Sequence, residues 1–265
     1  MRIRLNGLMG IVVAVLAVAS IAAAQQAPPA PTGPAPKLNG KPDLSGLWQR
    51  PYVPDMTATS RDGKTQAADS TLPADAKNKD RKELPFTEWG KQQWESYDAA
   101  KGDYTGSCLP FGLMRSMNSP DPIQIMQSDK YVALLYEQNT WFKVIPIDGR
   151  GHREQVGTWF GDSVGHWEGD TLVVDTINFN GKTRLDTIGH PHSEQLHTVE
   201  RFTRTDAGHI AYEVTIDDPK TFTRTWKNTR VFNLRPDWEI MEYSCEENNK
   251  DFLEGHIKGG LNPGK

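Results

Sequence analysis

Short strand-like runs joined by tight turns fill the second half of this 265-residue chain and limit its fold most strongly. From residue 123 onward, most runs alternate apolar and polar residues, and turn-forming pairs such as Gly169-Asp170 separate one run from the next. This spacing is typical of antiparallel hairpins. No helical run of useful length interrupts it, so a sheet built from βαβ units is not expected. The runs are IQIMQ, YVALLYE, WFKVIPI, VGHWE, TLVVDTI, LHTVERFTR, HIAYEVTI, TWKNTRVFNL and WEIMEYSC.

Eight or more sequential antiparallel strands have to hide their edges, and closing into an up-and-down barrel is the simplest way to do so. The sequence therefore predicts a mainly β protein, in which an antiparallel meander closes into a lipocalin-like β-barrel. One short N-terminal helix and an irregular insertion complete the predicted fold. A sandwich of two sheets is the alternative.

The Gly46-Leu47-Trp48 element is similar to the Gly-x-Trp element of lipocalin-like (calycin) barrels. In that family an arginine from a late strand lies over the tryptophan. The resemblance implies that Arg230 takes this place here. The long stretch between Trp48 and Ile123 departs from a plain lipocalin.

The first 24 residues have the pattern of a signal peptide. Arg2 and Arg4 precede an apolar run over residues 8–21, and the alanines at 22–24 form a cleavage site. A retained membrane anchor is the alternative, although the run is short for a membrane span. Cleavage predicts a periplasmic or secreted protein with no membrane association. Residues 25–41, rich in proline and alanine, are predicted to be a linker.

A single β-barrel domain is predicted over residues 42–252, and a flexible tail over 253–265. Residues 50–122 lack a regular strand pattern and are predicted to be an insertion. It contains a helix near 87–99, which Thr87 caps. We expect the aromatic residues near one face of this helix to cover the domain; lining a ligand site is the alternative. These residues are Phe86, Trp89, Trp94 and Tyr97.

Two cysteines, Cys108 and Cys245, are the only ones in the chain. An exported protein meets an oxidising compartment, so we expect them to form a disulfide. Two buried free thiols are the alternative. Neither cysteine belongs to a Cys-x-x-Cys motif, so a redox role is not expected.

The charge and the absent motifs limit the partners. The chain carries a net charge of −4, and the predicted cleavage removes two arginines and no acid. A nucleic-acid partner favours a basic face and is therefore not expected. The sequence has no P-loop and no dinucleotide fingerprint, so no organic cofactor is predicted. Ser163 lacks the Gly-x-Ser-x-Gly elbow, which argues against a serine hydrolase. The oligomeric state is left open.

Several motifs resemble a widespread family of exported bacterial proteins to which no function is assigned. They are PDLSGLW, GDSVGHWEGDTLVVDT, HPHSEQLHTVERF and EYSCEEN, and they span residues 42–248 in order. The resemblance implies an exported protein. It implies no activity and no catalytic residues, so the function has to be argued from the residues.

Residues 161–204 concentrate four of the seven histidines together with several carboxylates, which acid–base chemistry requires. We predict that His197 and His192 act as base and acid, oriented by Asp175 or Asp186. Asp175 is the best partner for His197, because a carboxylate in the apolar run TLVVDTI is costly unless it is paired. If the face of this strand that carries Asp175 lines the barrel, the Asp175–His197 pair points into the barrel interior. A further catalytic candidate is His166; a purely structural network is the alternative.

A metal site is a competing interpretation of the same stretch. His190, His192 and His197 offer three imidazoles, the first two in a His-x-His pair similar to the start of the cupin motif. The glutamate that should follow in that motif is missing. The alternative without a functional site is a loop whose histidines are solvated.

These observations leave three functions open. The first is an exported small-molecule enzyme of the lyase, dehydratase or isomerase type, with a pocket in the barrel. The second is a carrier without chemistry, and the third is a metalloenzyme. For either of the first two, the substrate-binding candidates are Tyr136, Tyr212, Arg115 and Trp167.

Overall fold

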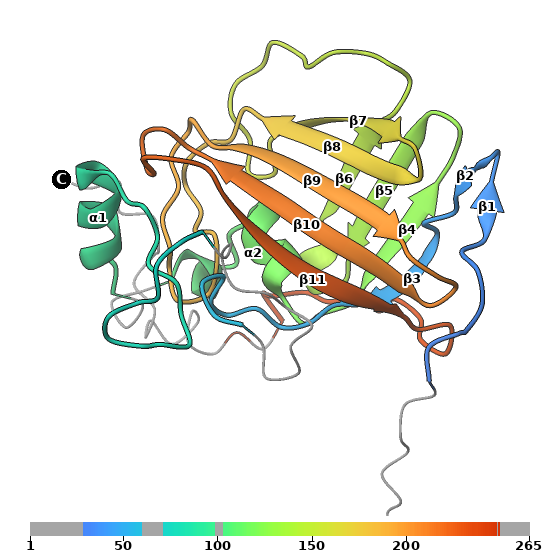
Figure 1. Ribbon diagram of the computed structural model, residues 1–265, viewed down its shortest axis with the longest axis horizontal. Helices are drawn as coiled ribbons and strands as arrows, with labels where there is room; N and C mark the ends of the chain where they lie inside the picture. The colour runs from blue at the N-terminus through green and yellow to red at the C-terminus, as the bar shows by residue number, and fades with distance from the viewer. Residues whose placement is uncertain (1–28, 60–70, 99–102, 248, 250–265) are drawn as a thin grey trace, which may run out of the picture.

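The computed structural model describes residues 29–59, 71–98, 103–247 and 249 (Figure 1). The predicted signal peptide (1–24) and tail (253–265) lie outside these ranges. Within them, no helix is both long enough and apolar enough to cross a membrane.

Nine antiparallel strands form one sheet that curls into a nearly closed barrel (Figure 1). The order along the sheet is β6-β5-β4-β3-β11-β10-β9-β8-β7. Strand β3, which comes first in the sequence, therefore pairs with β11, which comes last. The predicted mainly β fold with an up-and-down barrel is confirmed. The strands are β3 (Gly46–Gln49), β4 (Ile123–Gln127), β5 (Tyr131–Tyr136), β6 (Phe142–Pro146), β7 (Asp162–Glu168), β8 (Thr171–Ile177), β9 (His197–Arg204), β10 (His209–Asp217) and β11 (Trp226–Leu234).

The ring is left open between β6 and β7, which are the two ends of the sheet order. Side chains nevertheless meet across this seam. A Cβ atom added at Gly165 of β7 would lie 3.0 Å from the Cγ2 methyl groups of both Ile145 and Ile147. The glycine lets the two edges approach closely, and apolar packing closes the seam where ladder hydrogen bonds do not.

Strict alternation along the late strands builds the core. In β10 the inward residues Ile210, Tyr212, Val214 and Ile216 are buried, and the residues between them are half-buried. Burying an aliphatic side chain of this size contributes about 1.5–3 kcal/mol. A slip of one residue would turn all four side chains outward, so the pattern fixes the register of the sheet.

Trp48 is fully buried near the point where β3 meets β11, and its Nε1 donates to the carbonyl of Leu44 at 2.9 Å. The guanidinium that lies over its ring, 5.1 Å from the centroid, belongs to Arg204. The expectation of Arg230 was wrong, because Arg230 stacks on Tyr212 inside the barrel. Trp48 pairs with Leu234, so Arg230 lies four residues, about 13 Å, deeper along the strand.

The insertion contains two α-helices. Helix α1 (Glu88–Glu95) is the helix predicted near 87–99, and Thr87 caps it by accepting a hydrogen bond from the N–H of Gly90 at 3.0 Å. The sequence pattern does not predict α2 (Leu113–Asn118), because all six of its residues are buried and it has no amphipathic period. Helix α2 packs against side chains inside the barrel, where Asn118 meets Arg230. Two 3-10 turns are η2 (Tyr104–Ser107) and η3 (Gln138–Thr140).

Part of the predicted linker forms a small hairpin instead of an extended tether. Strands β1 (Lys37–Leu38) and β2 (Lys41–Pro42) pair on either side of Asn39-Gly40. Both turn residues have positive φ, 51° and 81°. Asn-Gly is a strong hairpin signal, which outweighs the proline-rich composition around it.

The predicted disulfide between Cys108 and Cys245 is present and joins residues 137 positions apart. It ties the insertion to the segment after β11. In the chain-entropy model a loop of this length corresponds to about 5 kcal/mol of stabilisation. The bond is compatible with an oxidising compartment.

Candidate functional site

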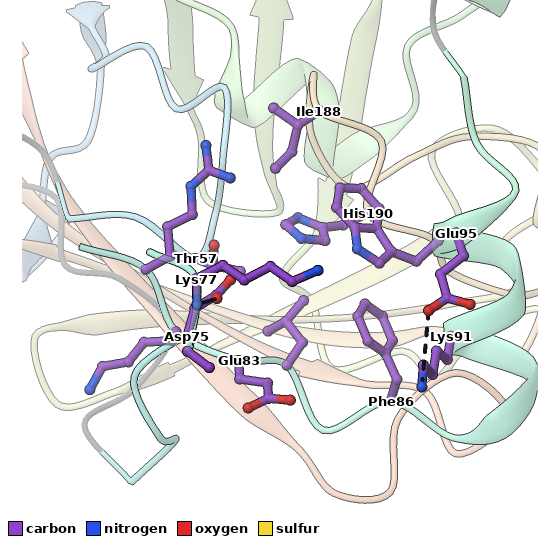
Figure 2. A pocket seen from close by; sticks show the side chains of 14 residues that line it. Thr57, Asp75, Lys77, Glu83, Phe86, Lys91, Glu95, Ile188 and His190 are labelled. Atoms are coloured by element: carbon purple, nitrogen blue, oxygen red, sulfur yellow. Dashed lines mark hydrogen bonds and ion pairs between the residues drawn. The ribbon is translucent and has the colours of Figure 1, made fainter. Parts of the chain in front are cut away.

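A hollow of about 370 Å³ lies outside the barrel, between the insertion and the loop that connects β8 to β9 (Figure 2). This volume falls in the range of small-molecule sites. Figure 2 shows His190 of the loop between Ile188 and Phe86, with Lys91 and Glu95 of α1 at one side. The hollow therefore brings one predicted histidine next to the aromatic face of α1.

The loop between β8 and β9 turns tightly enough to bring Asp186 and His190 together. The backbone N–H of Leu185 donates to the carbonyl of His190 at 2.9 Å. Between them Gly189 has φ 97°, and a Cβ atom there would lie 2.0 Å from the ring of Tyr97. Any other residue would be strained and would clash, so the glycine sets the shape of the loop.

Asp186 is fully buried and accepts four hydrogen bonds. Its Oδ2 faces Nδ1 of His190 at 2.6 Å and the N–H of Met56 at 2.8 Å, while Oδ1 faces the N–H groups of Gly189 and His190 at 3.1 Å. Burial alone raises the pKa of Asp186, but His190 and the backbone donors outweigh burial and hold this pKa below its ordinary 3.8. The carboxylate is therefore ionised at neutral pH.

The ionised carboxylate determines which nitrogen of His190 carries the proton. A carboxylate without a proton can only accept, so Nδ1 carries a hydrogen, and in the neutral ring Nε2 is the nitrogen with the lone pair. None of the described residues forms a hydrogen bond to this Nε2, and the imidazole lines the hollow. An imidazole oriented in this way by a buried carboxylate is the arrangement of a general base.

Aromatic rings hold the imidazole from the side of α1. The ring of Trp94 stacks on His190 with centroids 4.4 Å apart and an interplanar angle of 25°. The ring of Phe86 lies 6.3 Å from His190 and stacks on Phe222. Of the four aromatic residues singled out in the sequence, Phe86 and Trp94 line the hollow, whereas the ring of Trp89 lies against Lys220.

Asp55 and Arg81 form a second charged pair behind the hollow. The Nε atom of Arg81 lies 2.7 Å from Oδ2 of the buried Asp55. The other oxygen, Oδ1, accepts from the N–H and the hydroxyl of Thr57 at 2.8 and 2.5 Å. One oxygen of Asp55 lies within 4.8 Å of ligand atoms of Asp186 and His190. The two charged pairs are therefore neighbours.

This grouping of Asp55, Asp186 and His190 has the residue types of a cation site. The positive charge of Arg81, however, already lies 2.7 Å from Oδ2 of Asp55, although this oxygen accepts no hydrogen bond. Both oxygens of Asp186 accept N–H groups. The donor set therefore fits a hydrogen-bonded network better than a metal ion.

His192, predicted as a catalytic acid, uses both ring nitrogens for structural bonds. Its Nδ1 donates to the carbonyl of Ser193 at 2.9 Å, so its Nε2 accepts from the hydroxyl of Thr183 at 2.6 Å. Burial lowers the pKa of His192 and favours the neutral ring. The imidazole has no free nitrogen to offer a substrate.

The predicted pairing of His197 with Asp175 is confirmed, with Nε2 and Oδ2 2.7 Å apart. The condition for an interior position, that the face carrying Asp175 lines the barrel, is not met. In β8 the alternate residues Thr176 and Val174 are buried inward, so Asp175 faces outward. Its second oxygen contacts His152 at 2.7 Å, a partner that the sequence pattern does not predict. Asp175, His197 and His192 therefore do not share one cavity.

The metal trio His190, His192 and His197 is also not brought together, because the three imidazoles face Asp186, Thr183 and Asp175 respectively. His166 projects outward from β7, exposed, and meets Glu168 at 3.3 Å.

The remaining candidates are not at the hollow. Tyr136 and Tyr212 are buried inside the barrel, where the hydroxyl of Tyr212 donates to Glu200 at 3.0 Å. Arg115 is buried in α2 and pairs with Asp103 at 2.7 Å. Trp167 lines a different, smaller hollow near the β1–β2 hairpin.

No protein-family model matches the chain, and no curated protein matches its sequence. The resemblance to a family of exported bacterial proteins therefore stays a prediction.

Proposed function

We propose that this chain is an enzyme that moves a proton on a small molecule bound in the hollow, of the lyase, dehydratase or isomerase type. The observation that supports this proposal is the buried Asp186–His190 pair, with Nε2 left free beside a hollow of small-molecule size. In the proposed mechanism Nε2 removes a proton from the substrate, and Asp186 stabilises the imidazolium that forms. The proton then returns to another atom of the substrate or departs with its leaving group. His190 thus replaces His197 and His192 in the catalytic role.

We further propose that the enzyme works in the periplasm or outside the cell. The disulfide between Cys108 and Cys245 and the signal-peptide pattern of residues 1–24 support this location.

A carrier without chemistry is the second candidate, favoured by the aromatic wall of Phe86 and Trp94. It would use the same hollow. Large side chains such as Trp48, Phe202 and Phe232 are fully buried in the core, which disfavours the barrel as the binding cavity.

The two candidates differ in what happens to a bound compound. The mature protein is incubated in D2O with small carbonyl and carboxylate compounds, and NMR follows binding, conversion and exchange of carbon-bound hydrogen. We expect at least one bound compound to exchange or convert, and His190→Gln to slow this by about 100-fold or more. His166→Gln makes the same chemical change at an exposed site and should have no effect. Compounds that bind near His190 without exchange or conversion would favour the carrier. An unchanged rate in His190→Gln would remove His190 from the mechanism.

A further inference from the structure

We infer that the hollow takes a small planar monocarboxylate, with its carboxylate on Arg81 and its apolar body against Phe86 and Trp94. This inference rests on the proposed function, because it names the substrate class of the same site. It follows from the geometry of one guanidinium, the charges that line the hollow and the position of the aromatic wall.

Arg81 is fixed on one side and open on the other. Its Nε atom meets the buried carboxylate of Asp55, which Thr57 in turn holds through two hydrogen bonds. The two terminal amino groups of Arg81 donate to no described side chain or carbonyl, and its side chain is 40% exposed. A guanidinium with two free parallel amino groups matches the two oxygens of a carboxylate. The fold therefore presents an oriented but unused donor pair at the hollow.

The charges that line the hollow favour a single negative charge. Four basic side chains, Lys77, Arg81, Lys82 and Lys91, line the hollow with three acidic ones, and the buried Asp55 behind it pairs with Arg81. One basic group is already engaged, because Lys91 pairs with Glu95 of α1 at 4.0 Å. Because these charges nearly cancel, the lining accommodates a single negative charge on the free side of Arg81 better than a dianion such as a phosphate monoester.

The aromatic wall and the base lie within one ligand length of Arg81. The ring of Trp94 stacks on the imidazole of His190, and an oxygen of Asp55 lies within 4.8 Å of a nitrogen of His190. A flat ligand anchored at Arg81 therefore reaches Phe86 and Trp94 with its apolar part. The atoms next to its carboxylate then lie beside Nε2, so the hydrogen removed is one close to the carboxylate.

The test compares benzoate with benzamide, which has the same shape and no charge. Isothermal titration calorimetry on the mature protein measures both affinities, and the ring signals of His190 in NMR show whether binding occurs at the hollow. We expect benzoate to bind about tenfold more tightly than benzamide or better. Arg81→Lys keeps the positive charge but removes the two parallel amino groups, so it should weaken benzoate binding about tenfold. Arg201→Gln is the control, since Arg201 has a similar exposure and pairs with one carboxylate, Glu168, on the outer face of the barrel sheet.

Equal affinities for benzoate and benzamide, or unchanged benzoate binding in Arg81→Lys, would overturn the inference. So would the absence of benzoate binding at millimolar concentration. These failures would leave the role of His190 untouched, because that role is tested by conversion in His190→Gln. We expect His190→Gln to retain benzoate binding, which separates loss of chemistry from loss of the anion site.

Discussion

His190 donates from Nδ1 to the carboxylate of Asp186 at 2.6 Å, across only four residues of chain. Neither residue belongs to a strand. The same turn directs the backbone N–H groups of Gly189 and His190 at this carboxylate. The orientation of the imidazole is therefore built into the loop, and Trp94 stacks on the face of the ring.

Replacing Asp186 with asparagine should destabilise the fold. The new amide would point an NH2 group at backbone N–H donors that now face oxygen, which leaves buried donors without acceptors. We expect a loss of about 2–4 kcal/mol in the free energy of unfolding, measured by urea titration. Asp170→Asn is the control, because Asp170 lies in an exposed turn and its ion pair with Lys37 is long, at 3.7 Å. Equal unfolding midpoints for the two variants would contradict this role of Asp186.

The stability should also depend on pH through Asp186. Its pKa in the folded state is held below the ordinary 3.8, whereas the unfolded chain restores the ordinary value. A depressed pKa stabilises the fold above the unfolded value, and this contribution is lost as the pH falls through the folded value. Urea midpoints between pH 5 and pH 3 should therefore fall more steeply for the wild type than for Asp186→Asn. Parallel curves would show that Asp186 has no such linkage.

A buried ion pair inside the barrel gives a further prediction. Lys143 Nζ and Glu200 Oε2 lie 2.5 Å apart, and both side chains are almost completely buried. Lys143→Met leaves the carboxylate uncompensated and should cost about 3–5 kcal/mol of stability. Adding Glu200→Leu removes the stranded charge, and the double variant should recover most of the loss. If the double variant is less stable than Lys143→Met, the pair is not the source of the effect.

Reducing the disulfide should be costly. Replacing both Cys108 and Cys245 with serine releases a link between residues 137 positions apart. We expect a loss of about 2–5 kcal/mol, measured by thermal and urea unfolding. A wild-type protein treated with a reductant should unfold at the same midpoint as the double-serine variant. No change in either case would mean that the bond constrains the unfolded chain very little.

The fold could be predicted because its signal is local. Alternation in runs such as HIAYEVTI fixes which side chains face inward, and turn pairs mark where each strand ends. The pairing of His197 with Asp175 also followed from the sequence, because an acid in an apolar strand needs a partner. The sequence did not predict on which face of the sheet this pair lies, since one strand alone does not show which side of a sheet is the interior.

The site could be predicted only in part, because it depends on contacts between distant segments. Asp186 and His190 lie in the histidine-rich loop, but their pairing requires the positive φ of Gly189. Asp55 and Arg81 come from an insertion without periodicity, and only the folded chain brings them to the loop. The sequence singled out both the aromatic residues near α1 and the histidine-rich loop, but it did not predict that they meet at this hollow.

The cluster of Asp55, Asp186 and His190 also makes a prediction about metals. Because the positive charge of Arg81 lies against Asp55 and N–H groups occupy both oxygens of Asp186, we expect no stoichiometric zinc, and EDTA should leave the unfolding midpoint unchanged. Elemental analysis of protein purified without a His tag measures this. Zinc near one equivalent that is lost in Asp55→Asn would contradict the proposal and indicate a metalloenzyme.

The protonation state of His190 tests the central claim most directly and needs no substrate. Long-range 1H–15N NMR on the mature protein at neutral pH reports which ring nitrogen carries the hydrogen. We expect hydrogen on Nδ1, which faces Asp186, and we expect the Nε2 signal to move when benzoate is added. Hydrogen on Nε2, with Nδ1 bare, would contradict the account, because the imidazole could not then act as a base toward the hollow.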